Sequence, residues 1–342
     1  MYDVIVAGAG PAGLRCAHLL EKSGLNILVL ESKPAIGKPV QCSGLISRNL
    51  DRFMSVPESC IEHRVKGAIV HGPGSREIRL EKPSNAAYVI DREAFDRFLA
   101  SQVKSDIQLQ TELQKIRISS DVALTTNKGE FKSRALLGCD GPSSAVRKHF
   151  RVEPRELLQG IIAITDEPDR SGHVELFLDR DLCDGFLWKI PRGKSTEYGM
   201  LGSRVRFDQL TRFFRLNDVQ ERRAGIIPVG PCRSYFSRTL LVGDAAAQTK
   251  PWSGGGIIYS LTCADHAAST LVSCLKSGDL SEDALSSYEK EWKSELERPI
   301  SLGMMGRELY KEMDNKQLGE FMDRLAGMEL NSLDMDFPLL DF

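Results

Sequence analysis

The chain has 342 residues, of which 42% are hydrophobic and 27% are charged. This length suggests about two domains, with a core that needs no disulfide or metal to stabilise it. The 45 Lys and Arg residues nearly balance the 47 Asp and Glu residues, giving a net charge of −2, so we expect no nucleic-acid partner.

No apolar run approaches the roughly 18 residues of a membrane span. Because the N-terminus has the pattern of a strand, we expect no signal peptide. The eight cysteines include no C-x-x-C pair and the six histidines are scattered. We therefore expect no metal site and a reducing, cytoplasmic compartment.

A strand–helix–strand unit is predicted at the start of the chain. Residues 2–7 form a strand rich in Val and Ile, residues 11–23 have helical periodicity, and residues 26–30 form a second buried strand. Thirty-one residues therefore complete one βαβ unit, which ends at Glu31.

The glycine-rich turn of this unit has the spacing of a phosphate-binding loop. Gly8 permits a tight turn, Gly10 lets a pyrophosphate approach the backbone, and Gly13 allows close packing of helix on strand. The helix N-terminus then faces the phosphates, and Glu31 can accept hydrogen bonds from the adenosine ribose. The alternative is a glycine-rich turn without a ligand. The predicted dinucleotide-binding residues are Gly8, Gly10, Pro11, Ala12, Gly13 and Glu31.

The middle of the chain changes from mixed to β-rich patterns. After a loop at 37–46, alternating segments near 65–71 and 77–80 fit an antiparallel sheet, and residues 91–104 are helical. Further elements are listed by range: strands at 107–110, 134–138, 160–165, 173–178, 185–190, 196–201 and 239–242, a hairpin turn at 191–194, a long helix at 254–276, and charged helical sequence at 282–330.

A second motif favours FAD over a nicotinamide dinucleotide. The strand at 239–242 ends in Gly243-Asp244, and Gly254, Gly255, Gly256 and Ile257 then open a helix. Asp244 can accept a hydrogen bond from a ribitol hydroxyl, although an ordinary turn aspartate is the alternative. The glycine N–H groups can reach the N1/C2=O edge of a flavin, where the helix dipole stabilises negative charge.

With these motifs the chain resembles the FAD-dependent geranylgeranyl reductase family, within the para-hydroxybenzoate-hydroxylase-like flavoproteins. The stretches that carry the resemblance are Gly8–Gly13 with Glu31, Lys38-Pro39-Val40-Gln41-Cys42-Ser43-Gly44, residues 91–96, Cys139-Asp140-Gly141-Pro142-Ser143, residues 185–191 and residues 243–257.

The resemblance implies an α/β fold: a Rossmann-like FAD-binding domain, an inserted antiparallel β-rich substrate domain and a C-terminal helical segment. The expected boundaries are 1–65, 88–155 and 233–280 for the discontinuous FAD-binding domain, 66–87 and 156–232 for the substrate domain, and 281–342 for the helical segment.

The resemblance also implies roles for individual residues. Further FAD-binding positions are Gln41, Cys42, Ser43, Gly44, Arg92, Leu113, Asp140, Asp244, Gly255, Gly256 and Ile257. The expected substrate-cavity residues are Phe186, Trp188 and Trp252. Cys42 is the catalytic candidate, because a thiol there can hydrogen-bond the flavin or substrate, or supply a proton. The plainer alternatives are a surface Arg92, a core Leu113, a loop cysteine without chemistry at Cys42, and core aromatics at Phe186 and Trp188.

The implied reaction is reduction of C=C bonds in a polyprenyl chain, of a prenyl lipid or prenyl diphosphate, by hydride transfer from reduced flavin. No second G-x-G-x-x-G unit is present, so the expected electron donor is a ferredoxin or NAD(P)H. A contact of the amphipathic C-terminal region with a membrane surface is a further expectation.

Three other functions stay open. A flavin-dependent aromatic monooxygenase or halogenase is one, since residues 186–191 resemble the halogenase motif W-x-W-x-I-P with Phe186 in place of the first Trp. A quinone-linked electron-transfer flavoprotein and a non-catalytic FAD-binding protein are the others.

Overall fold

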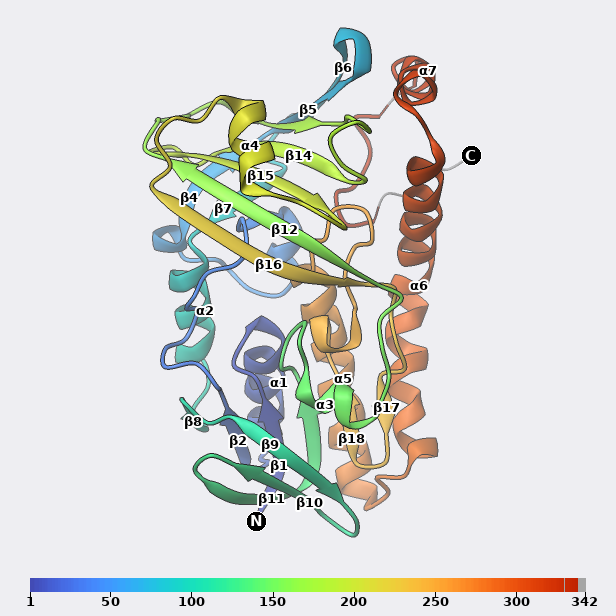
Figure 1. Cartoon of the computed structure of the whole chain (residues 1–342). Coiled ribbons are helices and arrows are strands. Elements are labelled where there is room, and N and C mark those ends of the chain that lie inside the picture. Colours follow the sequence, from blue (N-terminus) through green and yellow to red (C-terminus); the bar gives the residue numbers. More distant parts are fainter. Residues whose placement is uncertain (329, 338–342) are drawn as a thin grey trace. The chain divides into compact units, whose positions relative to one another are not determined.

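The computed structural model describes residues 1–328 and 330–337 (Figure 1). The chain forms two compact units. Unit 1 comprises Met1–Pro39, Glu93–Glu156 and Pro228–Ile300, and unit 2 comprises Val40–Arg92, Leu157–Ile227 and the chain from Ser301 onward. Residues 40–65 thus lie with the β-rich sequence, whereas the predicted boundaries group them with the FAD-binding domain.

A largely parallel sheet forms the centre of unit 1. Its strand order is β17-β18-β11-β1-β2-β8, and the strands from β18 to β8 pair in parallel. The bounds are β1 (Tyr2–Ala7), β2 (Ile27–Leu30), β8 (Asp106–Gln108), β11 (Gly129–Gly138), β17 (Tyr235–Phe236) and β18 (Thr239–Leu241). All four residues of β2 are buried, as expected for a parallel strand covered on both faces.

An antiparallel hairpin, β9 (Leu113–Ile118) and β10 (Val122–Thr126), pairs onto the first half of β11. The helical elements of this unit are α1 (Pro11–Lys22), α2 (Arg92–Ser101, whose first residue falls in unit 2), α3 (Ala145–His149), the 3-10 turn η4 (Gly243–Ala246) and α5 (Ile257–Ser277). Helices α1 and α5 pack together, and Arg15 and Asp265 form an ion pair between them at 2.6 Å.

A seven-stranded sheet forms the centre of unit 2, with the order β16-β12-β15-β14-β13-β5-β6. The bounds are β5 (Gly67–Gly72), β6 (Arg76–Glu81), β12 (Glu156–Thr165), β13 (His173–Phe177), β14 (Phe186–Pro191), β15 (Thr196–Gly202) and β16 (Glu221–Val229). The expected antiparallel pairing holds for four neighbouring pairs, but β5 and β13 are parallel. Roughly a hundred residues of chain separate β5 from β13, long enough for the crossover that a parallel pair requires.

A second, three-stranded sheet of unit 2 has the order β3-β7-β4. It is antiparallel and formed by β3 (Leu45–Ser47), β4 (Ile61–Val65) and β7 (Ala87–Ile90). Two 3-10 turns, η1 (Arg48–Arg52) and η2 (Glu58–Cys60), lie between β3 and β4 in the chain, and a third, η3 (Pro73–Ser75), lies between β5 and β6. Helix α4 (Phe207–Phe214) packs on β15 over an apolar cluster that includes Leu187, Met200 and Leu210.

Two helices follow α5 where continuous helical sequence was predicted. Helix α6 (Glu282–Glu312) contains Pro299, and α7 (Asn315–Leu325) begins at a capping box made by Asp314 and Gln317. Asp314 ends the continuity because its carboxylate accepts the N–H of Gln317, which is characteristic of a helix start. Residues 329 and 338–342 of the predicted C-terminal segment lie outside the described residues.

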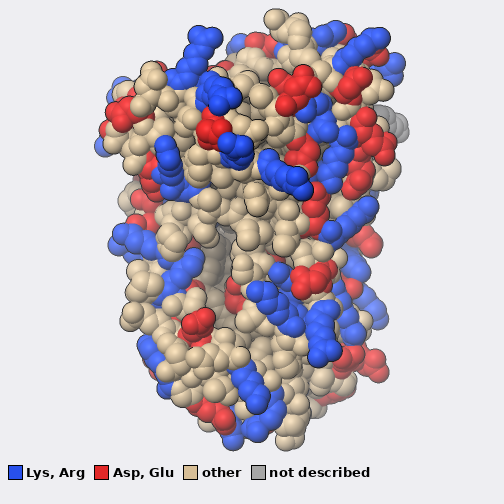
Figure 2. Space-filling view, in the orientation of Figure 1, with Lys and Arg blue, Asp and Glu red and all other residues tan. Residues whose placement is uncertain are grey.

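Charges of both signs are present on the face of the molecule that Figure 2 shows. On the face seen in Figure 2, Lys and Arg side chains alternate with Asp and Glu side chains without forming a large field of one sign. This distribution agrees with the near-zero net charge. Within the described residues, no helix is both long and apolar enough to cross a membrane.

Candidate cofactor site and the Cys42 loop

The turn between β1 and α1 has the shape that the glycine spacing predicts. Gly8 has φ of +103°, and a Cβ added there would lie 2.3 Å from the carbonyl oxygen of Cys139. A Cβ on Gly13 would lie 2.0 Å from the carbonyl oxygen of Gly8. Neither position accepts a side chain without a backbone shift, so the turn depends on both glycines.

Gly10 differs from these two, because no described atom lies within 4 Å of the place a Cβ would occupy. It is the N-cap of α1, no side chain caps the helix, and Pro11 follows at the first helical position. The first N–H groups of α1 therefore border open space. This arrangement fits a pyrophosphate group, which would interact with these N–H groups and with the helix dipole.

Glu31 lies directly beyond β2 and binds the glycine-rich turn itself. Its carboxylate accepts the N–H of Ala9 at 2.8 Å and the N–H of Lys33 at 2.9 Å. The carboxylate thus fixes the turn to the end of β2, and it has acceptor capacity left for a ribose hydroxyl.

Asp140 follows β11 and serves as an acceptor at the start of α3. Its carboxylate accepts hydrogen bonds from Ser144 Oγ at 2.5 Å and from the N–H of Ala145 at 2.7 Å. Burial raises the pKa of Asp140 against the opposing effect of these hydrogen bonds. Asp140 therefore shapes the loop after β11 through contacts within the chain.

Arg147 joins the two predicted flavin motifs, and it was not among the residues predicted from the sequence. Its guanidinium, 2% exposed, donates to the carbonyl oxygens of Pro142 at 2.6 Å and of Asp244 and Ala245 at 3.3 Å each. No pattern marks this residue, because an arginine beside Lys148 and His149 looks like the solvated end of a helix.

The residues predicted around Asp244 lie together at the start of α5. A Cβ added to Gly256 would lie 2.9 Å from Asp244 Oδ1, so the carboxylate is adjacent to the helix N-terminus. Gly256 is the N-cap without a side-chain cap, and Ile257 is the first helical residue. Gly255 and the half-buried Trp252 belong to the same segment. The buried Gln248, which sequence reasoning missed, accepts the N–H of Gly243 at 2.7 Å.

Two further predicted cofactor residues begin elements. Leu113 is the first residue of β9 and packs against the core cluster of the parallel sheet, in agreement with the core alternative. Arg92 is the first residue of α2 and is partly buried. Their roles toward FAD stay predictions.

The remaining predicted site residues lie in unit 2, around residues 41–44, which we call the Cys42 loop. Gln41 is exposed, Cys42 is half-buried and Gly44 is buried. Gly44 has φ of +76°, and a Cβ there would lie 2.2 Å from the carbonyl oxygen of Ile90. The N–H of Gly44 donates to Cys42 Sγ at 3.4 Å, and the N–H of Leu45 donates to Ser43 Oγ at 3.3 Å. The loop is thus folded tightly against β7.

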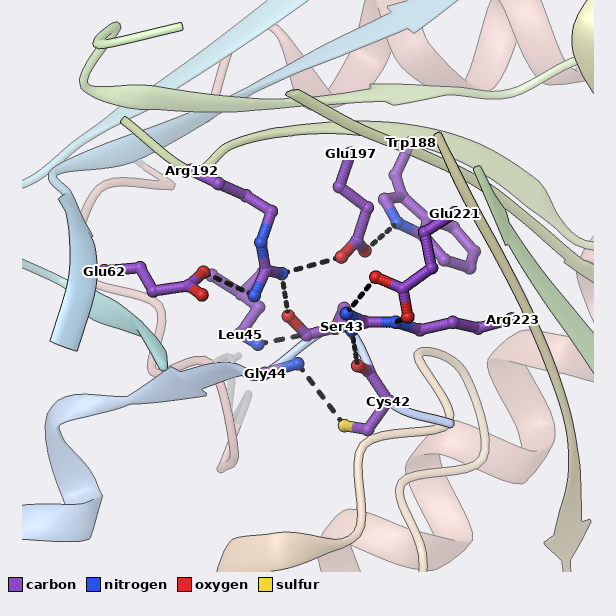
Figure 3. A network of polar contacts seen from close by, with 10 residues as sticks. All are labelled: Cys42, Ser43, Gly44, Leu45, Glu62, Trp188, Arg192, Glu197, Glu221 and Arg223. Atoms are coloured by element: carbon purple, nitrogen blue, oxygen red, sulfur yellow. Dashed lines mark hydrogen bonds and ion pairs between the residues drawn. The ribbon is translucent and has the colours of Figure 1, made fainter. Parts of the chain in front are cut away.

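Two arginines bind this loop (Figure 3). Arg192 Nη1 donates to the carbonyl oxygen of Ser43 at 2.6 Å, and Arg223 Nη1 donates to that of Cys42 at 3.3 Å. Arg192 was predicted only as part of a hairpin turn at 191–194, and no role was predicted for Arg223. Arg192 does lie in the turn after β14, but its side chain points into the unit and is 5% exposed.

A buried carboxylate connects Arg192 to the predicted cavity residue Trp188. Glu197 on β15 is 0% exposed, lies 2.8 Å from Arg192 Nη1 and accepts the indole N–H of Trp188 at 2.9 Å. Burial raises the pKa of Glu197, and the charge of Arg192 opposes the shift. Phe186 is buried and its ring centre lies 5.8 Å from that of half-buried Trp188. Phe186 and Trp188 thus form one aromatic pair on β14.

All eight cysteines are free thiols, and only Cys42 and Cys232 are not buried. Burial raises the pKa of Cys232 to about 11. Among the residues that the structure describes, no group of three or more His, Cys, Asp or Glu side chains is arranged to hold a metal ion.

Comparison with known proteins identifies the fold and its cofactor. The family model of the FAD binding domain matches residues 1–171. The chain is 26% identical to a digeranylgeranylglycerophospholipid reductase of Methanocaldococcus jannaschii, over 98% of this chain and 93% of that protein. Its structure is similar to a geranylgeranyl bacteriochlorophyll reductase-like protein from Thermoplasma acidophilum, with a TM-score of 0.90, 23% identity, and coverage of 97% of this chain and 93% of that chain.

The fold is also that of a p-nitrophenol 4-monooxygenase from Pseudomonas putida, with a TM-score of 0.75, 16% identity, and coverage of 95% of this chain and 93% of that chain. The predicted α/β flavoprotein fold is confirmed, and the fold alone does not separate a reductase from a monooxygenase.

Proposed function

The chain belongs to the FAD-binding-domain family, with FAD as its cofactor, and on that premise we propose that it reduces C=C bonds of a polyprenyl chain. The proposed substrate is a prenyl glycerophospholipid. A prenyl diphosphate, which carries the same kind of polyprenyl group, is the alternative substrate. The observation that carries the proposal is the similarity to a digeranylgeranylglycerophospholipid reductase over 98% of this chain. That similarity includes unit 2 as well as the residues matched by the FAD domain.

Within this proposal, reduced FAD supplies a hydride to one alkene carbon. The other carbon takes a proton, so each C=C bond gains two hydrogens and the flavin loses two electrons. An isolated alkene develops no oxyanion, so the protein's contribution is to orient the chain and exclude water. We assign the apolar wall to Phe186 and Trp188, and the proton to Cys42 Sγ or to a water molecule.

FAD binding is assigned to the residues predicted from the sequence. The open N-terminus of α1 at Gly10 is placed to bind the pyrophosphate and Glu31 the ribose, while the segment from Asp244 to Ile257 binds the flavin end. Arg147 supports this assignment, because it joins the loop after β11 to the turn that contains Asp244.

The electron donor and the membrane contact belong to the same proposal. A ferredoxin or NAD(P)H supplies electrons from outside the chain. Contact with a lipid surface is supported by Leu302, Met305 and Leu309, which are 40%, 68% and 51% exposed. Their spacing of three and four residues places them on one face of α6.

The proposal is tested by supplying unsaturated lipid to the protein with chemically reduced FAD, without oxygen, and measuring product mass. The expected product gains mass in steps of two hydrogens, and a fully saturated lipid of the same headgroup gives no flavin reoxidation. If no unsaturated prenyl compound reoxidises the flavin, the proposal fails. Oxygen-dependent modification of an aromatic compound would instead support a monooxygenase or halogenase.

A further inference from the structure

We propose that Arg192 and Arg223 are positioning residues that hold the Cys42 loop by the carbonyl oxygens of two consecutive residues. Their role in positioning is argued from geometry alone. Only the expected effect of this positioning on prenyl reduction rests on the proposed function. Figure 3 shows both guanidinium groups directed at the loop from different sides, Arg192 from the upper left and Arg223 from the right of the view.

The two arginines come from separate places in the β-sheet of unit 2. Arg192 follows β14 and Arg223 lies on β16, and in the sheet order β15 and β12 stand between these strands. Their donors nevertheless meet the neighbouring carbonyl groups of Ser43 and Cys42 at 2.6 and 3.3 Å. Hydrogen bonds to adjacent carbonyl groups fix the orientation of both peptide planes, and therefore the direction in which Cys42 Sγ points.

Each guanidinium is itself oriented by a carboxylate. Arg223 Nε and Nη2 donate to the two carboxylate oxygens of Glu221 at 2.7 and 2.8 Å. Arg192 is bound by Glu197 at 2.8 Å and by Glu62 at 2.5 Å. A planar guanidinium held in this way presents its remaining N–H groups in a fixed direction, which a lysine ammonium does not do.

Burial separates this network from an ordinary surface ion pair. The side chains of Arg192, Glu197 and Arg223 are 5%, 0% and 12% exposed. Removing such charges from water is unfavourable, and an apolar replacement of both partners is often neutral or stabilising. Stability is therefore a poor explanation for the pair, whereas orientation of its neighbours is a direct consequence of it.

The same carboxylate sets the orientation of Trp188. Glu197 Oε2 lies at Arg192 and Glu197 Oε1 accepts the indole N–H of Trp188. The loop that contains Cys42 and the aromatic side chain on β14 are thus held by one buried ion pair. A substitution of Arg192 or Glu197 should therefore change the orientation of both the Cys42 loop and Trp188.

The reactivity of the Cys42 thiol provides a test that does not depend on catalysis. The probe is an aromatic disulfide reagent added to the native holoenzyme at about pH 8. Cys232 is only about 0.1% thiolate there, because its pKa is about 11, and the other six cysteines are buried. We expect one rapidly reacting thiol in the native protein and none in Cys42→Ser.

Arg223→Lys keeps the positive charge but removes the planar guanidinium that binds Glu221 and the Cys42 carbonyl at the same time. We expect the reaction rate of Cys42 to rise about fivefold or more, because a lost charge-assisted hydrogen bond favours local opening of the loop. Arg206→Lys is the matched control: Arg206 binds Asp208 two residues away through the same two nitrogens, at 2.9 Å each, on an exposed surface. Its rate should stay at the wild-type value.

The double variant Arg192→Met with Glu197→Gln removes both buried charges together, and the Gln side chain can still accept from Trp188. Glu62 loses its partner in this variant but is 35% exposed, so water can solvate it. This variant should also raise the rate at which the Cys42 thiol reacts with the reagent, and the number of rapidly reacting thiols should still be one. Unchanged Cys42 rates in this variant and in Arg223→Lys would overturn the proposal. So would an equal rise in Arg206→Lys, or a general increase in reactive thiols.

Catalytic readouts separate this inference from the proposed function. If prenyl reduction occurs, Arg223→Lys should lower kcat more than it raises KM for the lipid. If the Cys42 rate responds as expected while no prenyl compound reoxidises the flavin, the positioning role stands and the proposed function fails. If wild-type protein reduces prenyl lipid but the arginine substitutions leave the reaction rate of Cys42 unchanged, only the positioning role fails.

Discussion

Arg192→Met is expected to destabilise the protein by an amount that depends on pH. The variant removes the guanidinium 2.8 Å from Glu197, whose side chain is 0% exposed. Glu62 also loses this partner but is 35% exposed, so water can solvate it. An unpaired buried carboxylate escapes the desolvation penalty by binding a proton. The free energy of protonating Glu197 therefore limits this part of the destabilisation.

The limit follows from the ordinary pKa of 4.5 for a glutamate. Protonation then costs about 4 kcal/mol at about pH 7.5 and about 1.4 kcal/mol at about pH 5.5. Because the pKa of Glu197 is raised in the folded variant, stability is greatest below 4.5 and is lost as the pH rises toward the folded pKa. Arg223 remains nearby and lowers the pKa of Glu197, so measured values should fall below these limits.

Urea unfolding at these two pH values, followed by tryptophan fluorescence, measures the effect. The stability deficit of Arg192→Met relative to wild type should grow by up to about 2.7 kcal/mol between the lower and the higher pH. The double variant Arg192→Met with Glu197→Gln should show a deficit that does not grow from the lower to the higher pH, because glutamine does not titrate. A deficit of Arg192→Met that is equal at both pH values would refute the assignment to Glu197.

Two further predictions concern the cofactor site and the α6 surface. Gly10→Ala should leave the unfolding free energy of the FAD-free protein unchanged and weaken FAD binding, because its Cβ meets no described atom; Gly13→Ala should lower both, since its Cβ would lie 2.0 Å from the carbonyl oxygen of Gly8. If Gly10→Ala and Gly13→Ala changed the FAD affinity and the unfolding free energy equally, the roles assigned to the two glycines would be wrong. Met305→Ser, at a residue 68% exposed, should reduce sedimentation with vesicles of anionic phospholipid while leaving turnover of detergent-dispersed substrate unchanged; undiminished sedimentation would exclude this face of α6.

Local sequence patterns predict the parts of the fold whose interactions are short in sequence. The βαβ unit from Tyr2 to Glu31 and the strand before Gly243 were predicted because buried parallel strands form continuous apolar runs. The hairpin of β9 and β10 was not predicted, since Leu113 and Gln114 break the polar–apolar alternation that residues 115–118 follow. Likewise, the parallel pairing of β5 with β13 cannot be inferred from either strand.

Only the parts of the candidate site that are short in sequence were predicted. The glycine-rich turn and the Gly243–Ile257 segment are contiguous motifs. Arg192 and Arg223 act on residues 149 and 181 positions away in the sequence, and no local pattern reports such a contact. The hairpin turn at 191–194 was predicted from Pro191, Gly193 and Lys194, but its sequence does not show that Glu197 and the Ser43 carbonyl direct Arg192 inward.

The central claim, reduction of prenyl double bonds by the bound flavin, is tested most directly by an anaerobic single-turnover experiment. Protein carrying reduced FAD is mixed with excess unsaturated prenyl glycerophospholipid, and flavin absorbance and lipid mass are followed together. We expect the oxidised flavin spectrum to return as one double bond is reduced for each flavin. A flavin that stays reduced in the presence of this lipid and of prenyl diphosphates, yet is reoxidised by oxygen, would contradict it.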